Sequence, residues 1–190
     1  MTQTEKRSEI LRSALVLISQ KGFHGAPMSM IADQAQVAMG TIYRCFESKE
    51  SLIHELHREL ESRFQTAIMQ DFPSGEPLRE RFLHVSRVFV RYSLASPTDF
   101  CFLEQFYNSP FGVSYRRDRI LGNNDTGVLQ KLLDEARKDG MLKPLPHTVL
   151  CALIFGPLFC LVRDHIFNFI ELDQKLVDAC LEATWDAIRL

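Results

Sequence analysis

The sequence predicts an all-α protein of about nine helices, with a three-helix head followed by a larger helical domain. Two observations lead to this prediction. Apolar residues recur at intervals of three and four positions through most of the 190-residue chain, and no segment shows the alternation of a half-buried strand. In addition, 46% of the residues are hydrophobic and 24% are charged, which provides enough apolar material for the core of a globular protein.

The three helices of the head are short or end at a clear signal. In the first helix, Ile10 and Ile18 belong to an apolar stripe, and Gly22 follows as a stop. The second helix is expected over about 28–35 and the third over about 39–46. Helices of this length are not stable alone in water, so we expect both to be held by packing against the first.

A long helix is expected over about 48–70. Ser48 can cap its N-terminus, and a single apolar stripe runs along it. The stripe comprises Leu52, Ile53, Leu56, Leu60, Phe64, Ala67 and Ile68. We expect a boundary between a domain at 1–48 and a domain at 49–190, with the helix at 49–70 shared as the connector.

The remaining helices are expected beyond the turn-forming segment at 71–77, which contains two prolines and a glycine. They cover about 78–92, 97–108, 128–140, 146–169 and 176–188. The segment 108–124 is expected to be turn-rich and basic. Pro157 lies inside one predicted helix, removes a backbone hydrogen bond there, and is expected to kink it.

Composition excludes several classes of protein. The five cysteines are odd in number, show no CxxC spacing and lie among apolar residues, as is typical of free thiols in a reducing cytoplasm. The first nine residues are polar or charged, unlike a secretory signal. The longest uncharged run, 148–162, has fifteen residues. A bilayer requires about 20, so we expect a buried core helix and no membrane partner.

Residues 28–46 are the candidate functional segment. Two short helices joined at 36–38 would form a helix-turn-helix, whose second helix can enter the major groove of DNA. On spacing alone, such a pair is equally consistent with ordinary packing in an all-α protein. Charge does not decide between them, because residues 1–50 hold six Lys or Arg and five Asp or Glu, a net charge of +1.

The residues of this segment favour DNA. The stretch from Ile31 to Leu52 reads IADQAQVAMGTIYRCFESKESL. It closely resembles the N-terminal domain of the TetR family of repressors, whose pattern is I-A-x-x-A-G-V-S-x-G-T-L/I-Y-x-Y/H-F-x-S/N-K-E/D-x-L. The resemblance covers about residues 8–56, and the rest of the chain matches the family only in the number and length of its helices.

The resemblance implies a set of DNA-facing residues, and the chemistry of each fits that role. The set is Ser29, Gly40, Thr41, Tyr43, Arg44 and Lys49, and Met39, which replaces a commoner polar residue of the family, is added for its apolar side chain. Gly40 has no side chain and permits close approach to DNA, Tyr43 offers a hydroxyl to a phosphate, and Arg44 can reach a phosphate or a guanine. Met39 suits a thymine methyl group, and Lys49 lies where a helix N-terminus also favours a phosphate. Exposed or half-buried structural positions are the alternative interpretation.

Two positions depart from the family pattern. Gln36 replaces the usual glycine of the turn and would need a left-handed backbone, which is uncommon for such a residue. Ala38 replaces the usual serine cap of the recognition helix, a loss of about 1 kcal/mol. Both changes weaken local stability without removing a contact to DNA.

The resemblance further implies a small-molecule cavity in the C-terminal domain. Aromatic residues are abundant there, and they suit an apolar or aromatic effector. The candidate effector-binding residues are Phe89, Tyr92, Phe102, Gln105, Phe106, Phe159 and His165. An ordinary aromatic core is the alternative. The last two helices are apolar over wide faces, and the resemblance implies a homodimer in which they form a four-helix bundle with the partner.

These observations predict a cytoplasmic, ligand-responsive regulator of transcription: a repressor released from palindromic operator DNA by a small molecule. The alternative is a helical carrier or partner-binding protein with a vestigial DNA-reading head. We expect neither an enzyme nor a cofactor. His54 and His57 lie three residues apart, but no cysteine or carboxylate completes a metal-binding spacing, and no glycine-rich phosphate loop occurs.

Overall fold

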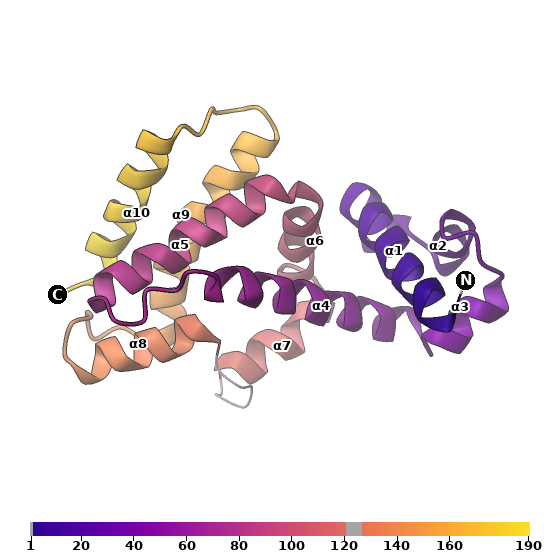
Figure 1. The fold of residues 1–190 in the computed structure, drawn as a ribbon, viewed down its shortest axis with the longest axis horizontal. Coiled ribbons are helices and arrows are strands. Elements are labelled where there is room, and N and C mark those ends of the chain that lie inside the picture. The colour runs from indigo at the N-terminus through magenta and orange to yellow at the C-terminus, as the bar shows by residue number, and fades with distance from the viewer. Residues whose placement is uncertain (1, 121–126) are drawn as a thin grey trace. The chain divides into compact units, whose positions relative to one another are not determined.

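A computed structural model describes residues 2–120 and 127–190 of the chain (Figure 1). Its regular elements are ten α-helices, and the sole β-type pairing in these two ranges is an isolated bridge between Leu142 and Arg189. The helices are α1 Gln3–Gly25, α2 Met28–Gln34, α3 Met39–Cys45, α4 Lys49–Met69, α5 Leu78–Ala95, α6 Pro97–Tyr107, α7 Pro110–Ile120, α8 Val128–Lys138, α9 His147–Ile166 and α10 Gln174–Ile188. The prediction of an all-α fold is confirmed.

Helix α7 accounts for the difference between nine expected helices and ten. It occupies most of the segment 108–124, so the prediction of turns there was wrong for Pro110–Ile120, while 121–124 lie outside the described residues. Pro110 suits the first position of a helix. Phe111 and Tyr115 then pack against a buried core formed with other helices. Packing, rather than a regular apolar period, therefore stabilises this helix.

The chain folds into two compact units. Unit 1 extends to Ser62 and includes Thr98–Tyr115, whereas unit 2 comprises Arg63–Pro97 and Arg116–Leu190. The boundary between the units falls within helix α4, between Ser62 and Arg63. Helix α6 and the first turns of α7 belong with the head, although a boundary at residue 48 places them in the second domain. The assignment of DNA binding to residues 1–48, and of effector binding and dimerisation to residues 49–190, stays a prediction.

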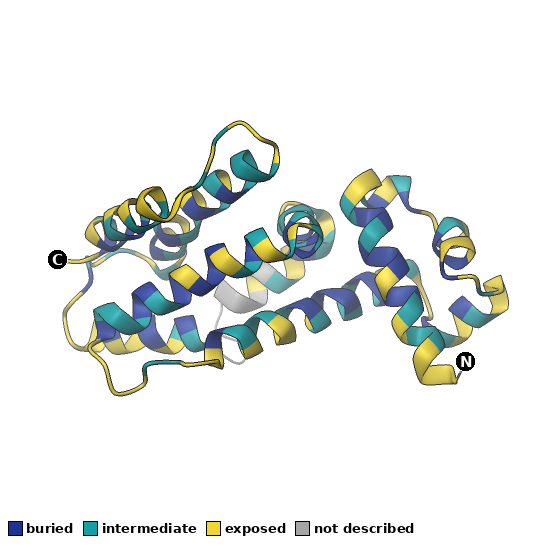
Figure 2. Cartoon of the chain, turned by 45° about the horizontal axis from the view of Figure 1, so that its top comes forward, coloured by how far each residue is buried: buried dark blue, intermediate teal, exposed yellow. Residues whose placement is uncertain are grey.

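Unit 1 has a continuous apolar core beneath its three N-terminal helices. Its fully buried side chains include Ile10, Ile18, Ile31, Ile42, Leu52, Leu56, Phe102 and Phe106. Helix α1 is interrupted at Gly22, where φ is 73° and ψ is 171°, so the predicted stop is confirmed. A side chain rarely adopts this conformation, which explains the glycine. In Figure 2 the buried positions of α1 and α4 form stripes along one side of each helix.

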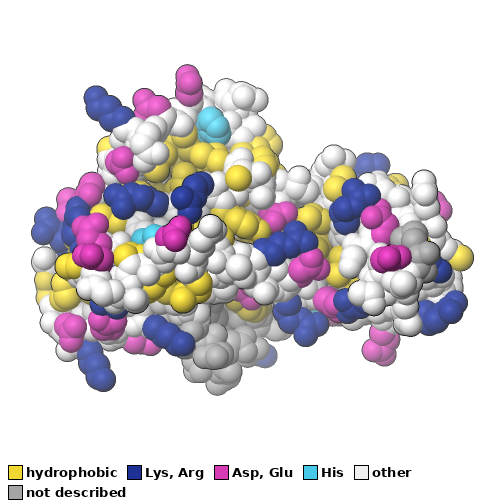
Figure 3. All heavy atoms as spheres, viewed as in Figure 1, with side chains coloured by type: hydrophobic (Ala, Val, Ile, Leu, Met, Phe, Trp, Pro, Cys, Tyr) yellow, Lys and Arg dark blue, Asp and Glu magenta, His cyan; other side chains and the backbone are white. Residues whose placement is uncertain are grey.

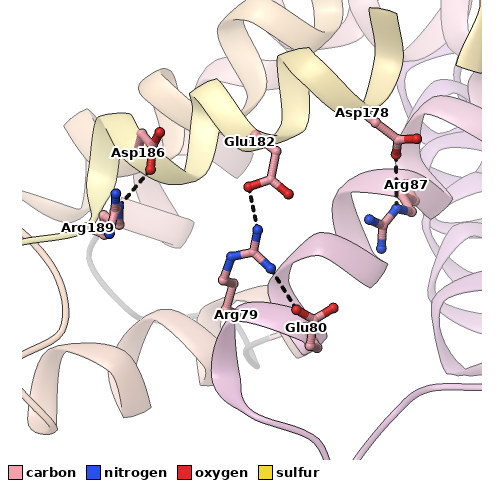
Figure 4. A network of polar contacts seen from close by, with 7 residues as sticks. All are labelled: Arg79, Glu80, Arg87, Asp178, Glu182, Asp186 and Arg189. Atoms are coloured by element: carbon pink, nitrogen blue, oxygen red, sulfur yellow. Dashed lines mark hydrogen bonds and ion pairs between the residues drawn. The ribbon is translucent and has the colours of Figure 1, made fainter. Parts of the chain in front are cut away.

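Unit 2 is built on α5, which packs against α8, α9 and α10. Phe82 of α5 and Trp185 of α10 lie with ring centroids 5.2 Å apart within the core. Ion pairs at the edge of this packing join the same two helices (Figure 4). Arg79 contacts Glu182, and Arg87 Nε lies 3.4 Å from a carboxylate oxygen of Asp178. Aromatic packing and charge pairing thus fix α10 on α5.

Helix α9 is the one helix in the described part that is long and apolar enough to cross a membrane by length and composition. It packs against α5 and α10, and it buries Leu150, Ile154, Leu158 and Val162 on one side. The prediction of a buried core helix therefore holds for that side alone. Pro157 lies within this single helix, and the kink expected there stays a prediction.

Candidate functional site

The turn between α2 and α3 has the geometry that its sequence predicts. Gln36 adopts φ 54°, so the left-handed backbone expected there is confirmed. The Val37 amide donates to the Ala32 carbonyl at 3.0 Å, and the Gln36 amide donates to the Asp33 carbonyl at 3.1 Å. These two hydrogen bonds form a Schellman ending, which satisfies carbonyls at the end of α2. The turn forms without glycine, at the cost of backbone strain.

Helix α3 begins without a side-chain cap. Ala38 is its N-cap, with φ −68° and ψ 149°, and accepts no hydrogen bond through its side chain. Its carbonyl accepts from the Thr41 amide at 2.8 Å, so the first helical turn closes normally. Ile42, fully buried, anchors the helix in the core of unit 1. Tertiary packing therefore compensates for the missing cap.

One face of α3 is open to solvent. Met39 and Tyr43 are large and exposed, with relative accessibilities of 40% and 53%, and Arg44 is also exposed. A Cβ added at Gly40 would meet no atom within 4 Å, so no internal packing requires a glycine there. Thr41 is half-buried. This face presents a hydroxyl, a guanidinium and a thioether beside a position where the backbone can approach a surface closely.

Ser29 and Lys49 flank this face in the chain. Ser29 is exposed in the first turn of α2. Lys49 begins α4, and its ammonium donates a hydrogen bond to the Phe23 carbonyl. Burial lowers the pKa of Lys49 from its ordinary value. One of its donors therefore ties the start of α4 to the end of α1.

Helix α4 starts at a reciprocal serine cap. The Ser51 amide donates to the hydroxyl oxygen of Ser48 at 3.0 Å, and the Ser51 side chain contacts the backbone of Ser48 in return. The predicted cap is therefore confirmed. Because α4 directly follows α3, this cap fixes the chain direction between the exposed helix and the connector.

Much of the positive charge near the head is paired internally. Arg12 Nη2 lies 2.6 Å from a carboxylate oxygen of Glu9, and Arg7 pairs with Glu55 while its guanidinium lies 5.0 Å from the centroid of the Phe46 ring. The guanidinium groups of Arg7 and Arg12 are therefore held by neighbouring carboxylates. The basic group on the exposed face is instead that of Arg44.

An aromatic cluster lies in unit 2, where α4, α5 and α9 contribute rings. Phe89 is its centre: its ring centroid lies 4.9 Å from that of Phe159, 5.4 Å from that of Phe155 and 6.0 Å from that of Phe64. Tyr92 joins the cluster through Phe64 at 5.6 Å. Phe89, Tyr92 and Phe159 were among the expected effector-binding residues. Phe64 and Phe155 were not, although Phe155 precedes Phe159 by one helical turn.

The other expected effector-binding residues lie elsewhere. Phe102 and Phe106 are fully buried in the core of unit 1, and Gln105 donates to the Ser19 carbonyl at 3.1 Å in the same unit. His165 belongs to unit 2, but its Nδ1 accepts from the Leu172 amide at 3.1 Å and so orders the chain after α9. We therefore omit these four residues from the candidate effector site.

Helices α9 and α10 each expose a row of small or apolar residues. The rows comprise Val149, Ala152, Gly156 and Cys160 on α9, and Leu176, Ala179 and Ala183 on α10. Figure 3 shows hydrophobic side chains gathered over the surface that these helices form. Exposed apolar patches of this kind are uncommon on monomers and typical of interaction surfaces.

Metal-binding groups form no cluster. No three His, Cys, Asp or Glu side chains lie together in an arrangement that could hold a metal ion, within the ranges that the structure describes. His54 and His57 each contact other residues. His54 Nε2 lies 3.6 Å from a carboxylate oxygen of Glu50, and the His57 ring stacks on Phe106 with centroids 4.0 Å apart.

Comparison with known protein families divides the chain at the connector. Residues 10–56 match the family described as bacterial regulatory proteins, tetR family. Residues 57–190 match the family described as tetracyclin repressor-like, C-terminal domain. The two matches together account for nearly the whole chain.

Individual relatives match most of the chain. The chain is 33% identical over 176 residues to the fatty acid metabolism regulator protein of Bacillus subtilis, covering 90% of this chain and 86% of the relative. A TetR family transcription regulator from Marinobacter aquaeolei has a similar fold, with a TM-score of 0.83, 23% identity and coverage of 98% and 96% of the two chains. The FadR regulator of Bacillus subtilis, crystallised with stearoyl-CoA, gives a TM-score of 0.75 and 21% identity, covering 95% and 98%.

Proposed function

Since the chain belongs to the TetR family and is a ligand-responsive, DNA-binding regulator of transcription, we propose that it represses its target genes through the exposed face of α3. The observation that carries this proposal is the division of α3 into two sides. Ile42 is fully buried, while Tyr43 and Arg44 project from the opposite side beside the open position at Gly40. Tyr43 donates to a phosphate, Arg44 reaches a phosphate or a guanine, and Met39 contacts a thymine methyl group.

The test is binding to the DNA immediately upstream of the gene itself, measured by fluorescence anisotropy at several salt concentrations. Changing Tyr43→Ala and Arg44→Ala together removes two contacts at exposed positions. We expect affinity to fall about 100-fold, because single contacts contribute about 1–3 kcal/mol, and we expect a shallower salt dependence. Lys131→Ala, at an exposed position on α8, is the control and should bind normally. Unchanged binding by the double variant would refute these roles.

We further propose a homodimer formed by α9 and α10. Their exposed apolar rows support it, because a four-helix bundle with a second copy would remove these rows from water. A two-fold dimer presents two copies of α3 to successive major grooves of a palindromic operator. Each row contains small residues, which allow helices of two copies to approach closely.

The effector is proposed to bind at the aromatic cluster around Phe89, Tyr92 and Phe159. Rings from three helices meet there, and an apolar or aromatic molecule can insert between them. The stearoyl-CoA bound to FadR of Bacillus subtilis supports a long acyl chain as the first effector class to test. No catalytic step is proposed, and the cytoplasm is the expected location of a bacterial regulator of transcription.

The mechanism that we propose is a shift between two populations. An effector that prefers a conformation unsuited to the operator lowers DNA affinity by its difference in affinity for the two conformations. Helix α4 supports this coupling, because Leu52 and Leu56 are buried in the core of unit 1 while Phe64 contacts the aromatic cluster of unit 2. A single helix thus contributes to both binding regions.

A further inference from the structure

Cys151 and His147 form a thiol–imidazole pair on α9. They are separated by one helical turn, and the Cys151 sulfur lies 3.3 Å from His147 Nε2. Both side chains are half-buried rather than enclosed. An imidazole nitrogen at this distance can take the thiol proton, and the resulting thiolate is the nucleophilic form of cysteine.

Cys151 lies in the second turn of α9, one turn after His147, which is the first residue of the helix. Other thiols lie in different surroundings. Burial raises the pKa of Cys101 and of Cys180, whereas Cys160 is exposed further along α9.

We propose that Cys151, activated by His147, is a site of covalent modification by soft carbon electrophiles, of which α,β-unsaturated carbonyl compounds are the representative class. The thiol proton moves to His147 Nε2, and the sulfur attacks the β-carbon to form a C–S bond. The π electrons of the double bond shift to give an enolate. Its α-carbon then takes the proton back from the imidazolium, so the addition needs no other reactant.

The adduct would lie beside the aromatic cluster. Phe155 follows Cys151 by one turn on the same stripe of α9, and its ring centroid is 5.4 Å from that of Phe89. The exposed row through Ala152 and Gly156 occupies the neighbouring stripe, so modification does not require the proposed dimer surface to open. Resting on the proposed function, we infer that the adduct acts as a covalent effector and weakens operator binding.

The reactive site is tested by N-ethylmaleimide, a soft electrophile of this class, on the folded full-length protein at neutral pH. Peptide mass spectrometry follows each cysteine with time. We expect Cys151 to react about tenfold faster than the more exposed Cys160, because His147 Nε2 lies within reach of the Cys151 thiol proton and can act as its general base. His147→Gln keeps a polar side chain but takes no proton, and should slow Cys151 about tenfold without changing Cys160. Equal rates at the two cysteines, or a rate at Cys151 unaffected by His147→Gln, would overturn the site.

The regulatory consequence is tested separately by operator affinity before and after labelling. Wild-type protein should lose affinity about tenfold on labelling, in the range of typical coupling between sites, whereas Cys151→Ala protein should be unaffected. An equal loss in the Cys151→Ala protein would assign the effect to another thiol and overturn the regulatory role. Failure of unlabelled protein to bind DNA would refute the proposed function instead, because the labelling rates do not depend on DNA.

Discussion

The two units expose opposite kinds of surface. In unit 1, the apolar side of α3 is closed by Ile42, and the exposed side carries Tyr43 and Arg44. In unit 2, α9 and α10 leave apolar rows in contact with water, including Ala152 and Leu176. In the head, the apolar side of α3 is therefore buried and its exposed side is polar. Unit 2 instead exposes apolar surface that a second copy can cover.

The largest expected effect comes from placing a charge in the exposed row of α9. A Cβ at Gly156 meets no atom within 4 Å, so Gly156→Glu fits the single chain and even improves helix propensity. In a dimer, the same carboxylate would be buried without a partner. We expect monomers by light scattering and an operator affinity reduced about 100-fold or more, since the two heads would then bind independently.

Gly156→Ala is the matched control, because it adds a methyl group and no charge. It should remain dimeric and bind the operator. A dimeric Gly156→Glu protein with wild-type affinity would contradict an interface on this face of α9. An unchanged helical circular dichroism spectrum of the variant at ambient temperature would show that any loss of dimer is not a loss of fold.

The second prediction compares Phe106 and Phe159, which were both expected from the sequence to bind the effector. Phe106 is fully buried in the core of unit 1, whereas Phe159 is half-buried in the aromatic cluster of unit 2. Phe106→Ala should lower the free energy of unfolding by about 3–5 kcal/mol and impair DNA binding through the head. Phe159→Ala should cost less stability and instead abolish the rise in melting temperature that we expect stearoyl-CoA to produce in the wild type. If Phe106→Ala abolished the effect of stearoyl-CoA and Phe159→Ala caused the larger loss of stability, Phe106 would be assigned to the effector site and Phe159 to the core.

Much of the head was predictable from sequence because its signals are local. Gly22, Gln36 and Ser48 each mark a backbone conformation or a cap that depends on a few neighbouring residues, and the structure has all three. The spacing of Tyr43 from the buried Ile42 likewise follows from one helix alone. The turn between α2 and α3 and the exposed face of α3 were therefore both predictable from patterns that span a few residues.

The division of the aromatics between the units was not predictable in this way. Periodicity shows that Phe106 lies on the apolar face of a helix, but not which neighbouring helix covers that face. The structure places α6 in unit 1, where Gln105 contacts the Ser19 carbonyl. Helix α7 was missed for the same reason. It is stabilised by contacts that are distant in sequence, including the hydrogen bond that the Tyr115 hydroxyl donates to the Glu61 carboxylate.

A smaller effect is expected at the turn of the head. Gln36 has φ 54°, a conformation that glycine adopts without strain, so Gln36→Gly should raise the free energy of unfolding by about 1 kcal/mol. Gln34→Gly, within α2, is the matched control and should lower it by about 1 kcal/mol. Urea unfolding followed by circular dichroism measures both. Destabilisation by Gln36→Gly would show that the glutamine side chain contributes more than the strained backbone costs.

The smallest expected effect concerns the pairing of α5 with α8 and depends on pH. Arg81 Nη1 donates to a carboxylate oxygen of Glu135 at 2.9 Å, and this hydrogen bonding lowers the pKa of Glu135 below its ordinary value. A carboxyl group with a lowered pKa in the folded state stabilises the fold above its unfolded pKa, and loses that contribution as the pH falls through the folded value. Glu135→Gln should therefore lower the free energy of unfolding at neutral pH by under about 1 kcal/mol, because Glu135 is largely exposed. The difference from the wild type should shrink at acid pH, below the ordinary range of a glutamate carboxyl group, because the lowered pKa of Glu135 is reached only there. A difference that persists at that pH would assign the effect to packing of the side chain rather than to its charge, and would make α5–α8 association resemble the apolar core of unit 1.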